Sequence, residues 1–189
     1  MTVRDARADY FAANGFSEAA YSDRWVKLKL GPIPLVMWSS PGRRRAVVLH
    51  DLHHVATGYA TTWAGEAEIG AWEIAAGCAD YAAAWFYNAS AFAFGMVVHP
   101  RRTFRAFVRG RRSRSLYVHG GYRPELLDLE VVELRRELAL DLAPDRPPPP
   151  PTWRDRLAYV VAIPSALLRA TLSAIGPSHR NVRCTDRGA

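Results

Sequence analysis

The sequence predicts a mainly α-helical protein, with a single helical domain, a small amino-terminal β-hairpin and an amphipathic helix after a proline-rich linker. Three observations support this fold class. Most apolar residues recur at helical spacing, one short segment alternates in polarity, and a run of prolines precedes the last apolar segment. The chain has 189 residues, of which 49% are hydrophobic, and this is enough for one buried core.

These patterns divide the chain into four parts. We predict a helical domain at 1–143 and a stiff linker at 144–152, where prolines dominate. Apolar residues at helical spacing predict an amphipathic helix at 153–176, which either anchors at a membrane interface or docks on the domain or on a partner. Residues 177–189 read as a disordered tail.

The first elements are expected to be short. Residues 9–20 predict a helix that breaks at Gly15. Charged and apolar residues alternate over 25–30, residues 31–32 are a glycine and a proline that can turn, and residues 33–38 are mostly apolar. This order predicts a β-hairpin.

Two helices follow in which chemically reactive residues gather. Apolar spacing predicts one helix over 46–57 and a second that starts near Trp63 and continues to Asp80. Later in the chain, Pro124 is expected to open a helix that runs to Leu138 and closes the core.

The first of these two helices carries residues typical of metal ligands. A helix turns by about 100° per residue, so His54 lies about 40° and Asp51 about 100° around the axis from His50. These three share one face, and Glu66 on the next helix can fold back towards them. His53 points to the other side by about 60°, so we interpret it as a neighbour of the ligands.

We therefore predict a divalent metal held by His50, Asp51, His54 and Glu66. Two imidazoles and two carboxylates suit zinc, iron or manganese, and ligand type alone does not choose among them. The alternative is a buried polar pair of histidines without a metal.

Two further acids are spaced to support this site. Glu66, Glu73 and Asp80 are seven residues apart, so a continuous helix would place them on one face. We predict that Glu73 and Asp80 orient the ligands or act as acid and base in catalysis.

The ligand spacing resembles a known signature. His-Asp, two residues, His, eleven residues and Glu is similar to the motif of the Coq-four family of ubiquinone (coenzyme Q) biosynthesis proteins. Weaker similarity extends over Tyr10 to Leu142 and includes Gly58, Gly65 and Glu73. The run that starts at Arg43 departs from the Arg-Tyr-Arg-Glu type that the family tends to have there.

This resemblance implies a function. It suggests a metal-dependent carbon–carbon lyase that decarboxylates a polyprenylated hydroxybenzoate at ring carbon one, with zinc as our first choice of metal. It also implies a prenylated aromatic lipid as substrate, and partners that include the membrane surface and either a second copy or other quinone-biosynthesis proteins. The alternative is a non-catalytic scaffold that binds such lipids.

Two segments bear on membrane contact. Residues 81–98 carry no formal charge, and we interpret them as a buried or membrane-facing helix in preference to a span. Seven arginines follow within 101–114, which suits an anionic membrane surface or a solvated basic face. Nucleic acid is an unlikely partner, because no nucleic-acid motif accompanies them.

The remaining features concern location. The first nine residues lack an apolar core, so we expect no secretory signal and a cytoplasmic protein, peripherally associated with the inner membrane. Cys78 and Cys184 lie far apart, which argues against a disulfide framework or a thiolate zinc site.

Overall fold

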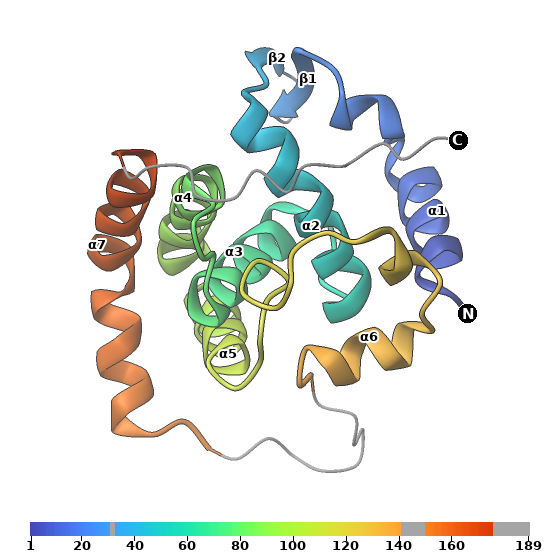
Figure 1. Cartoon of the computed structure of the whole chain (residues 1–189). Helices are drawn as coiled ribbons and strands as arrows, with labels where there is room; N and C mark the ends of the chain where they lie inside the picture. The colour runs from blue at the N-terminus through green and yellow to red at the C-terminus, as the bar shows by residue number, and fades with distance from the viewer. Residues whose placement is uncertain (31–32, 141–149, 176–189) are drawn as a thin grey trace.

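The computed structural model describes residues 1–30, 33–140 and 150–175. The predicted linker at 144–152 therefore lies mostly outside the described residues, and the predicted tail at 177–189 lies outside them entirely. The prediction of a mainly helical protein is confirmed (Figure 1). In chain order the elements are α1 (Val3–Asn14), η1 (Glu18–Tyr21), β1 (Trp25–Leu30), β2 (Ile33–Trp38), α2 (Pro41–Thr57), α3 (Trp63–Ala76), α4 (Ala82–Val98), α5 (Pro100–Gly110), η2 (Pro124–Leu127), α6 (Val131–Glu137) and α7 (Trp153–Ile175).

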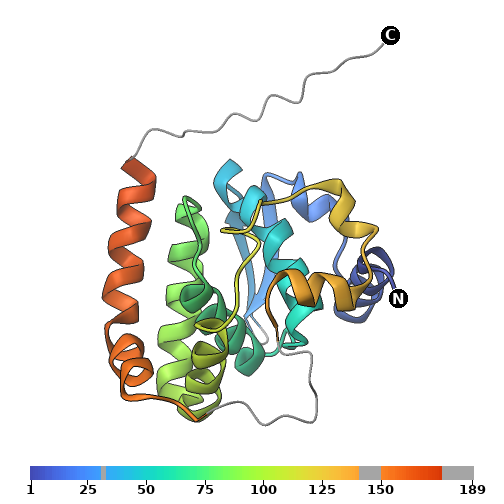
Figure 2. The same ribbon diagram turned by 60° about the horizontal axis from the view of Figure 1, so that its bottom comes forward.

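The helices form successive layers. In Figure 2, α7 stands at one side, α4 and α5 come next, α2 and α3 occupy the middle, and α1 and α6 cover the other side. Helix α3 packs against α4 and α5, and α2 packs against α1, α4 and α6. The pair α2 and α3, which carries the predicted ligands, therefore lies inside the protein.

Helix α2 is longer than expected. It begins at Pro41, where we expected Ala46, because Ser40 caps it by accepting the backbone N–H of Arg43 at 3.1 Å. It ends at Gly58, which adopts φ +78°, a left-handed conformation that favours glycine.

Helix α3 begins at Trp63 as predicted but ends before Asp80. Thr62 caps its start, and the helix stops at Ala76 because Gly77 takes φ +97°. Asp80 lies in the exposed turn that follows. The prediction that it shares the helical face of Glu66 and Glu73 is wrong.

Glycines permit the close packing of the middle layers. A Cβ added at Gly110 would lie 2.3 Å from the Trp72 carbonyl oxygen, and one added at Gly95 would lie 2.5 Å from the Ala67 Cβ. Trp72 and Phe92 are fully buried in this core. Helix α4 buries one face here, in agreement with a buried helix, and at 17 residues it is short for a membrane span.

The segment from the end of η2 to the start of α6 is hydrogen-bonded to the amino terminus. The backbone N–H of Val3 donates to the Leu129 carbonyl at 2.8 Å, and that of Val131 donates to the Met1 carbonyl at 3.1 Å. The single helix predicted from Pro124 to Leu138 is wrong, because a break after η2 is followed by a new start at α6. Glu130 forms a capping box there with Glu133.

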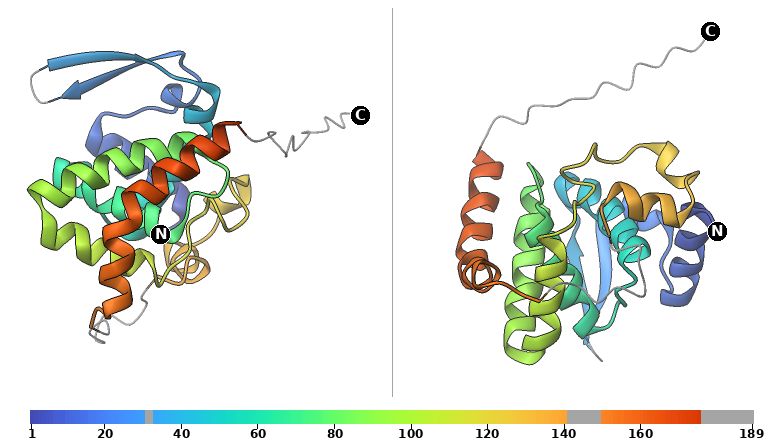
Figure 3. Two further views of the ribbon diagram at one scale, coloured as in Figure 1. Left: turned by 90° about the vertical axis from the view of Figure 1, so that its left-hand side faces the viewer. Right: turned by 90° about the horizontal axis from the view of Figure 1, so that it is seen from below.

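Strands β1 and β2 pair antiparallel, with Trp25 opposite Trp38 and Leu30 opposite Ile33. They extend along one side of the helical body (Figure 3). The residues that connect them are outside the described part.

The predicted carboxyl-terminal helix is confirmed as α7, which lies along α4 (Figure 3). Its inner face carries Ala162 and Ala166, which are buried, and Tyr159, whose ring contacts Phe92 and Phe107 at centroid distances of 5.1 and 5.3 Å. Asp155 at its start binds Arg111 of the domain at 2.8 Å. These contacts hold α7 against the domain.

Candidate metal centre

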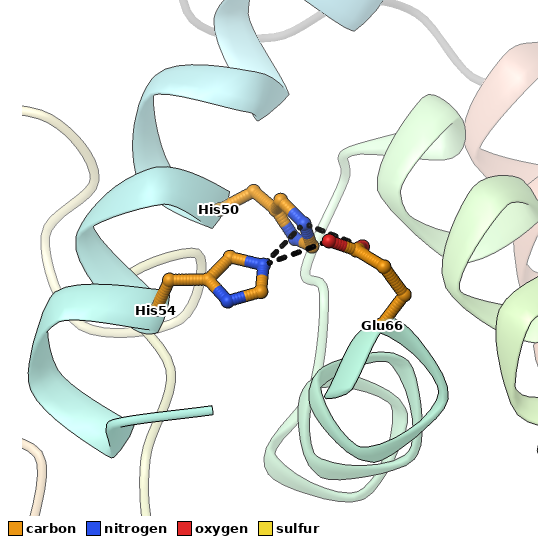
Figure 4. Close-up of side chains that lie close together, drawn as sticks. All are labelled: His50, His54 and Glu66. Atoms are coloured by element: carbon orange, nitrogen blue, oxygen red, sulfur yellow. Dashed lines mark hydrogen bonds and ion pairs between the residues drawn. The ribbon is translucent and has the colours of Figure 1, made fainter. Parts of the chain in front are cut away.

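Three of the predicted ligands converge between α2 and α3 (Figure 4). The Nε2 atoms of His50 and His54 are 3.2 Å apart. Glu66 reaches across from α3, with Oε1 3.5 Å from His54 Nε2 and Oε2 3.6 Å from His50 Nε2. Within the described residues these three form a cluster whose potential ligand atoms lie within 4.8 Å of one another.

The spacing of these atoms fits a common metal ion. Zinc binds imidazole nitrogen and carboxylate oxygen at about 2.0–2.2 Å, and two ligands of a tetrahedral ion are then about 3.3 Å apart. The Nε2–Nε2 distance of 3.2 Å, and the distances of 3.5 and 3.6 Å from each Nε2 to one of the two Glu66 oxygens, lie close to this value. Three protein ligands also leave a fourth position open, as catalytic zinc sites do.

Both histidines are oriented by their second ring nitrogen. His50 Nδ1 lies 2.9 Å from Glu73 Oε1, and His54 Nδ1 lies 2.8 Å from the Tyr59 carbonyl oxygen. Since both of these groups are hydrogen-bond acceptors, each Nδ1 carries a proton when its ring is neutral, and each Nε2 lone pair then faces Glu66. This is the usual arrangement of metal-binding histidines.

Burial and charge set the protonation of the cluster. Burial, followed by the charge of His50, lowers the pKa of His54 to about 4, so His54 is neutral near pH 7. Burial also lowers the pKa of His50, but Glu73 and Glu66 outweigh it and the net pKa is well above the ordinary value. Burial raises the pKa of Glu66, but its contacts with the two histidines outweigh this and keep the carboxyl ionised.

Glu73 supports the cluster from a fully buried position. Its Oε1 accepts from His50 Nδ1 and also from His53 Nδ1 at 2.7 Å, and its Oε2 accepts from Tyr117 Oη at 3.2 Å and from Asn88 Nδ2. Burial raises the pKa of Glu73, but the nearby histidines outweigh it and hold the pKa well below its usual range. Glu73 thus fixes the ring orientation of both His50 and His53.

His53 belongs to this supporting shell, as the helical rotation predicted. It is fully buried, and its Nε2 accepts the backbone N–H of Leu116 at 2.8 Å. Because Nε2 is the acceptor, Nδ1 carries the proton that His53 donates to Glu73. His53 therefore couples the cluster to the loop after α5.

Asp51 is not part of the cluster. Its Oδ2 accepts from Tyr21 Oη at 2.7 Å, and its Oδ1 is 3.5 Å from Tyr10 Oη. The rotation of about 100° from His50 carries its carboxylate to the side of α2 that α1 and η1 cover. The Tyr10 ring also stacks on His54, with centroids 5.5 Å apart.

Asp80 is also absent from the site, because it lies in the exposed turn after α3. Several supporting residues were not foreseen from the sequence: Tyr21, Tyr59, Asn88, Leu116 and Tyr117. They reach the site from distant segments, and no spacing rule connects them to α2.

A pocket of about 210 Å³ opens beside the cluster, between α2 and α4. Its lining includes His50 and Glu66 of the cluster, together with Tyr87, Asn88 and Arg43. The side chain of Glu66 is 38% exposed, so the cluster is accessible. The pocket therefore borders two of the three clustered residues.

Comparison of the chain with protein-family models, with curated proteins and with solved structures found no match.

Proposed function

We propose that the chain is a metal-dependent enzyme in which His50, His54 and Glu66 hold a divalent cation and the substrate occupies the adjacent pocket. The observation that supports this most strongly is that the two Nε2 atoms lie 3.2 Å apart, each 3.5 or 3.6 Å from one oxygen of Glu66, with each histidine fixed through its Nδ1. Zinc is our first choice, because two histidines, one glutamate and an open position are typical of catalytic zinc.

The proposed substrate is a polyprenylated hydroxybenzoate, which loses its carboxyl group at ring carbon one. This part rests on the resemblance of the ligand spacing to the Coq-four family. A bound cation would stabilise the negative charge that develops as carbon dioxide leaves. Glu73 would keep His50 oriented, and the pocket would hold the ring.

In this proposal, the proton that replaces the carboxyl group comes from neither of the two acids that the sequence suggested. Glu73 is fully buried and accepts hydrogen bonds at both oxygens, and Asp80 lies outside the site. Glu66 borders the pocket and is partly exposed, so solvent has access beside it.

We further propose that the protein works at the inner membrane from the cytoplasmic side, where a prenylated substrate would reside. Among the described residues, α7 is the one helix long and apolar enough to cross a membrane. Because its inner face packs on α4, it would instead lie in the interface with its outer face in the lipid. Partner proteins of quinone biosynthesis, or a second copy of the chain, would join it there.

A direct assay tests this proposal. Zinc-loaded protein in lipid vesicles would be given a prenylated 4-hydroxybenzoate with a labelled carboxyl group, and release of labelled carbon dioxide would be measured. We expect release with wild type and Asp80→Asn, and loss with His54→Ala and Glu66→Ala. Release that persists in both ligand variants would contradict the proposed metal role.

A second candidate is a scaffold that binds prenylated lipid without turnover. Two observations favour it. Helix α7 has a large apolar outer face, and Glu73 has no carboxyl oxygen free to act as a catalytic acid, because both accept hydrogen bonds within the protein. In the same assay a scaffold would retain the labelled lipid and release no carbon dioxide, and the metal variants would bind the lipid as wild type does.

A further inference from the structure

Arg43 lies on the same face of α2 as His50. The two residues are seven apart, so their Cα atoms are separated by about 10 Å along the helix and about 20° around it. Both line the 210 Å³ pocket. The lining of this pocket therefore includes two candidate metal ligands, His50 and Glu66, and also Arg43, which lies two helical turns before His50 on α2.

The guanidinium of Arg43 forms no ion pair with a carboxylate in the part of the chain that the structure describes, although the more distant Asp51 raises its pKa slightly against the effect of burial. It donates from Nη1 to the Ser39 hydroxyl at 3.2 Å, and Ser39 is fully buried. Other arginines do have such partners, as Arg102 has Glu68 at 2.7 Å and Arg111 has Asp155 at 2.8 Å.

This lack of a partner is informative because Arg43 is partly buried. Burial of a charge without an opposite charge is unfavourable, and here burial lowers the pKa of Arg43. A guanidinium has five N–H donors in a planar fork, which matches a carboxylate in a bidentate pair. An anionic ligand in the pocket would supply the missing partner.

The remaining walls suit a flat apolar body. Ala83, Ala84 and Ala91 are small, and Tyr87 adds an aromatic ring. A volume of about 210 Å³ is less than the roughly 300–1,000 Å³ of pockets for drug-sized ligands. The pocket therefore fits a single ring, and any long tail would have to leave it.

We propose that Arg43 binds the carboxylate of a substrate with a single ring, and that an oxygen at the opposite end of this ring lies at the metal centre. The contact of the substrate with the metal rests on the function proposed above. The contact of its carboxylate with Arg43 rests on Arg43 and the pocket alone. Arg43 would thus fix which way round the ring enters. Substrates that carry the anionic group and a hydroxyl at opposite ends of the ring would be selected.

Binding measurements on the full-length protein test this assignment. Zinc-loaded wild type would be titrated with 4-hydroxybenzoate and with 4-hydroxybenzyl alcohol, which keeps the ring and phenol but lacks the negative charge. The same titrations would be made with Arg43→Gln, with Arg43→Lys, and with Arg45→Gln as a control, since Arg45 is exposed on the same helix. Circular dichroism and zinc content would verify that each variant is folded and loaded.

We expect Arg43→Gln to weaken binding of the carboxylate about tenfold or more and to leave binding of the alcohol unchanged. Arg43→Lys would restore only part of the affinity, because lysine cannot form the bidentate pair. Arg45→Gln would bind as wild type does. If Arg43→Gln does not fold, the lysine variant provides the same comparison between the two ligands.

Two results would overturn the proposal: no measurable binding of 4-hydroxybenzoate by wild type, or equal weakening of both ligands in Arg43→Gln. Failure of the metal proposal would look different. Wild type would then hold no zinc, yet it would still bind the carboxylate in a manner that depends on Arg43.

Discussion

The candidate metal centre and helix α7 depart from ordinary protein architecture in opposite ways. The centre buries ionisable groups, with Glu73 and His53 fully enclosed, and hydrogen bonds satisfy them. Helix α7 instead exposes large apolar side chains along its outer face: Trp153, Leu157, Val160, Val161, Leu167, Leu168, Leu172 and Ile175.

The two regions differ in where the groups that stabilise them come from. The buried charges of the centre are paired within the chain, so the fold itself explains how they are tolerated. In the described part of the chain, nothing covers the outer face of α7. Because exposed apolar patches of this kind mark interaction surfaces, its partner is expected outside the described part of the chain. Changes at the two regions should therefore affect different properties.

The largest effect on stability is expected at Glu73. Glu73→Ala would remove the carboxylate that accepts from four donors, two of which, on His50 and His53, have no other acceptor at that nitrogen among the described contacts, and it would remove the charge that opposes His50. We predict a loss of about 3–5 kcal/mol in the free energy of unfolding, measured by urea denaturation. Asp80→Ala, at an exposed turn, should change it by no more than about 0.5 kcal/mol. Equal effects of the two changes would show that the Glu73 network contributes little.

A smaller effect is expected at Gly65, which precedes the candidate ligand Glu66. A Cβ there would lie 1.9 Å from the Ala60 carbonyl oxygen, so the start of α3 would have to move. Gly65→Ala should lower the free energy of unfolding by about 1–3 kcal/mol and should also weaken zinc binding. Gly42→Ala is the control, because its nearest neighbour atom would be 3.9 Å away. Unchanged zinc affinity in Gly65→Ala would mean that Glu66 is not held by this contact.

The smallest effect on stability is expected on the outer face of α7. A triple change of Val160, Leu168 and Leu172 to serine should alter the free energy of unfolding by no more than about 1.5 kcal/mol, since the three sites are exposed. It should nevertheless abolish co-sedimentation with anionic lipid vesicles, because each large apolar side chain contributes about 1.5–3 kcal/mol when it is buried. Vesicle binding equal to that of wild type would show that the lipid-facing surface lies elsewhere.

The sequence indicated the parts of the site that depend on local spacing. His50 and His54 are one helical turn apart, and this periodicity placed them correctly on one face. Asp51 was misplaced because its partners, Tyr10 and Tyr21, come from a distant segment. Local periodicity carries no information about such contacts.

The predicted helix boundaries were wrong where single residues override the periodicity. Asp80 was predicted to lie on α3 because the acids recur every seven residues, but Gly77 ends that helix. The helix expected from Pro124 splits because Glu130 starts a new capping box. Helix α7 was predictable in position because its apolar residues recur over 23 residues.

The central claim, a metal held by His50, His54 and Glu66, is tested most directly by elemental analysis of purified, zinc-reconstituted protein. We predict about one zinc ion per wild-type chain and loss of zinc in folded His54→Ala and Glu66→Ala. Asp51→Asn should retain zinc, because the wild-type Asp51 carboxylate faces Tyr21 and lies outside the cluster. Wild-type protein that takes up no metal, or ligand variants that retain it fully, would contradict the account.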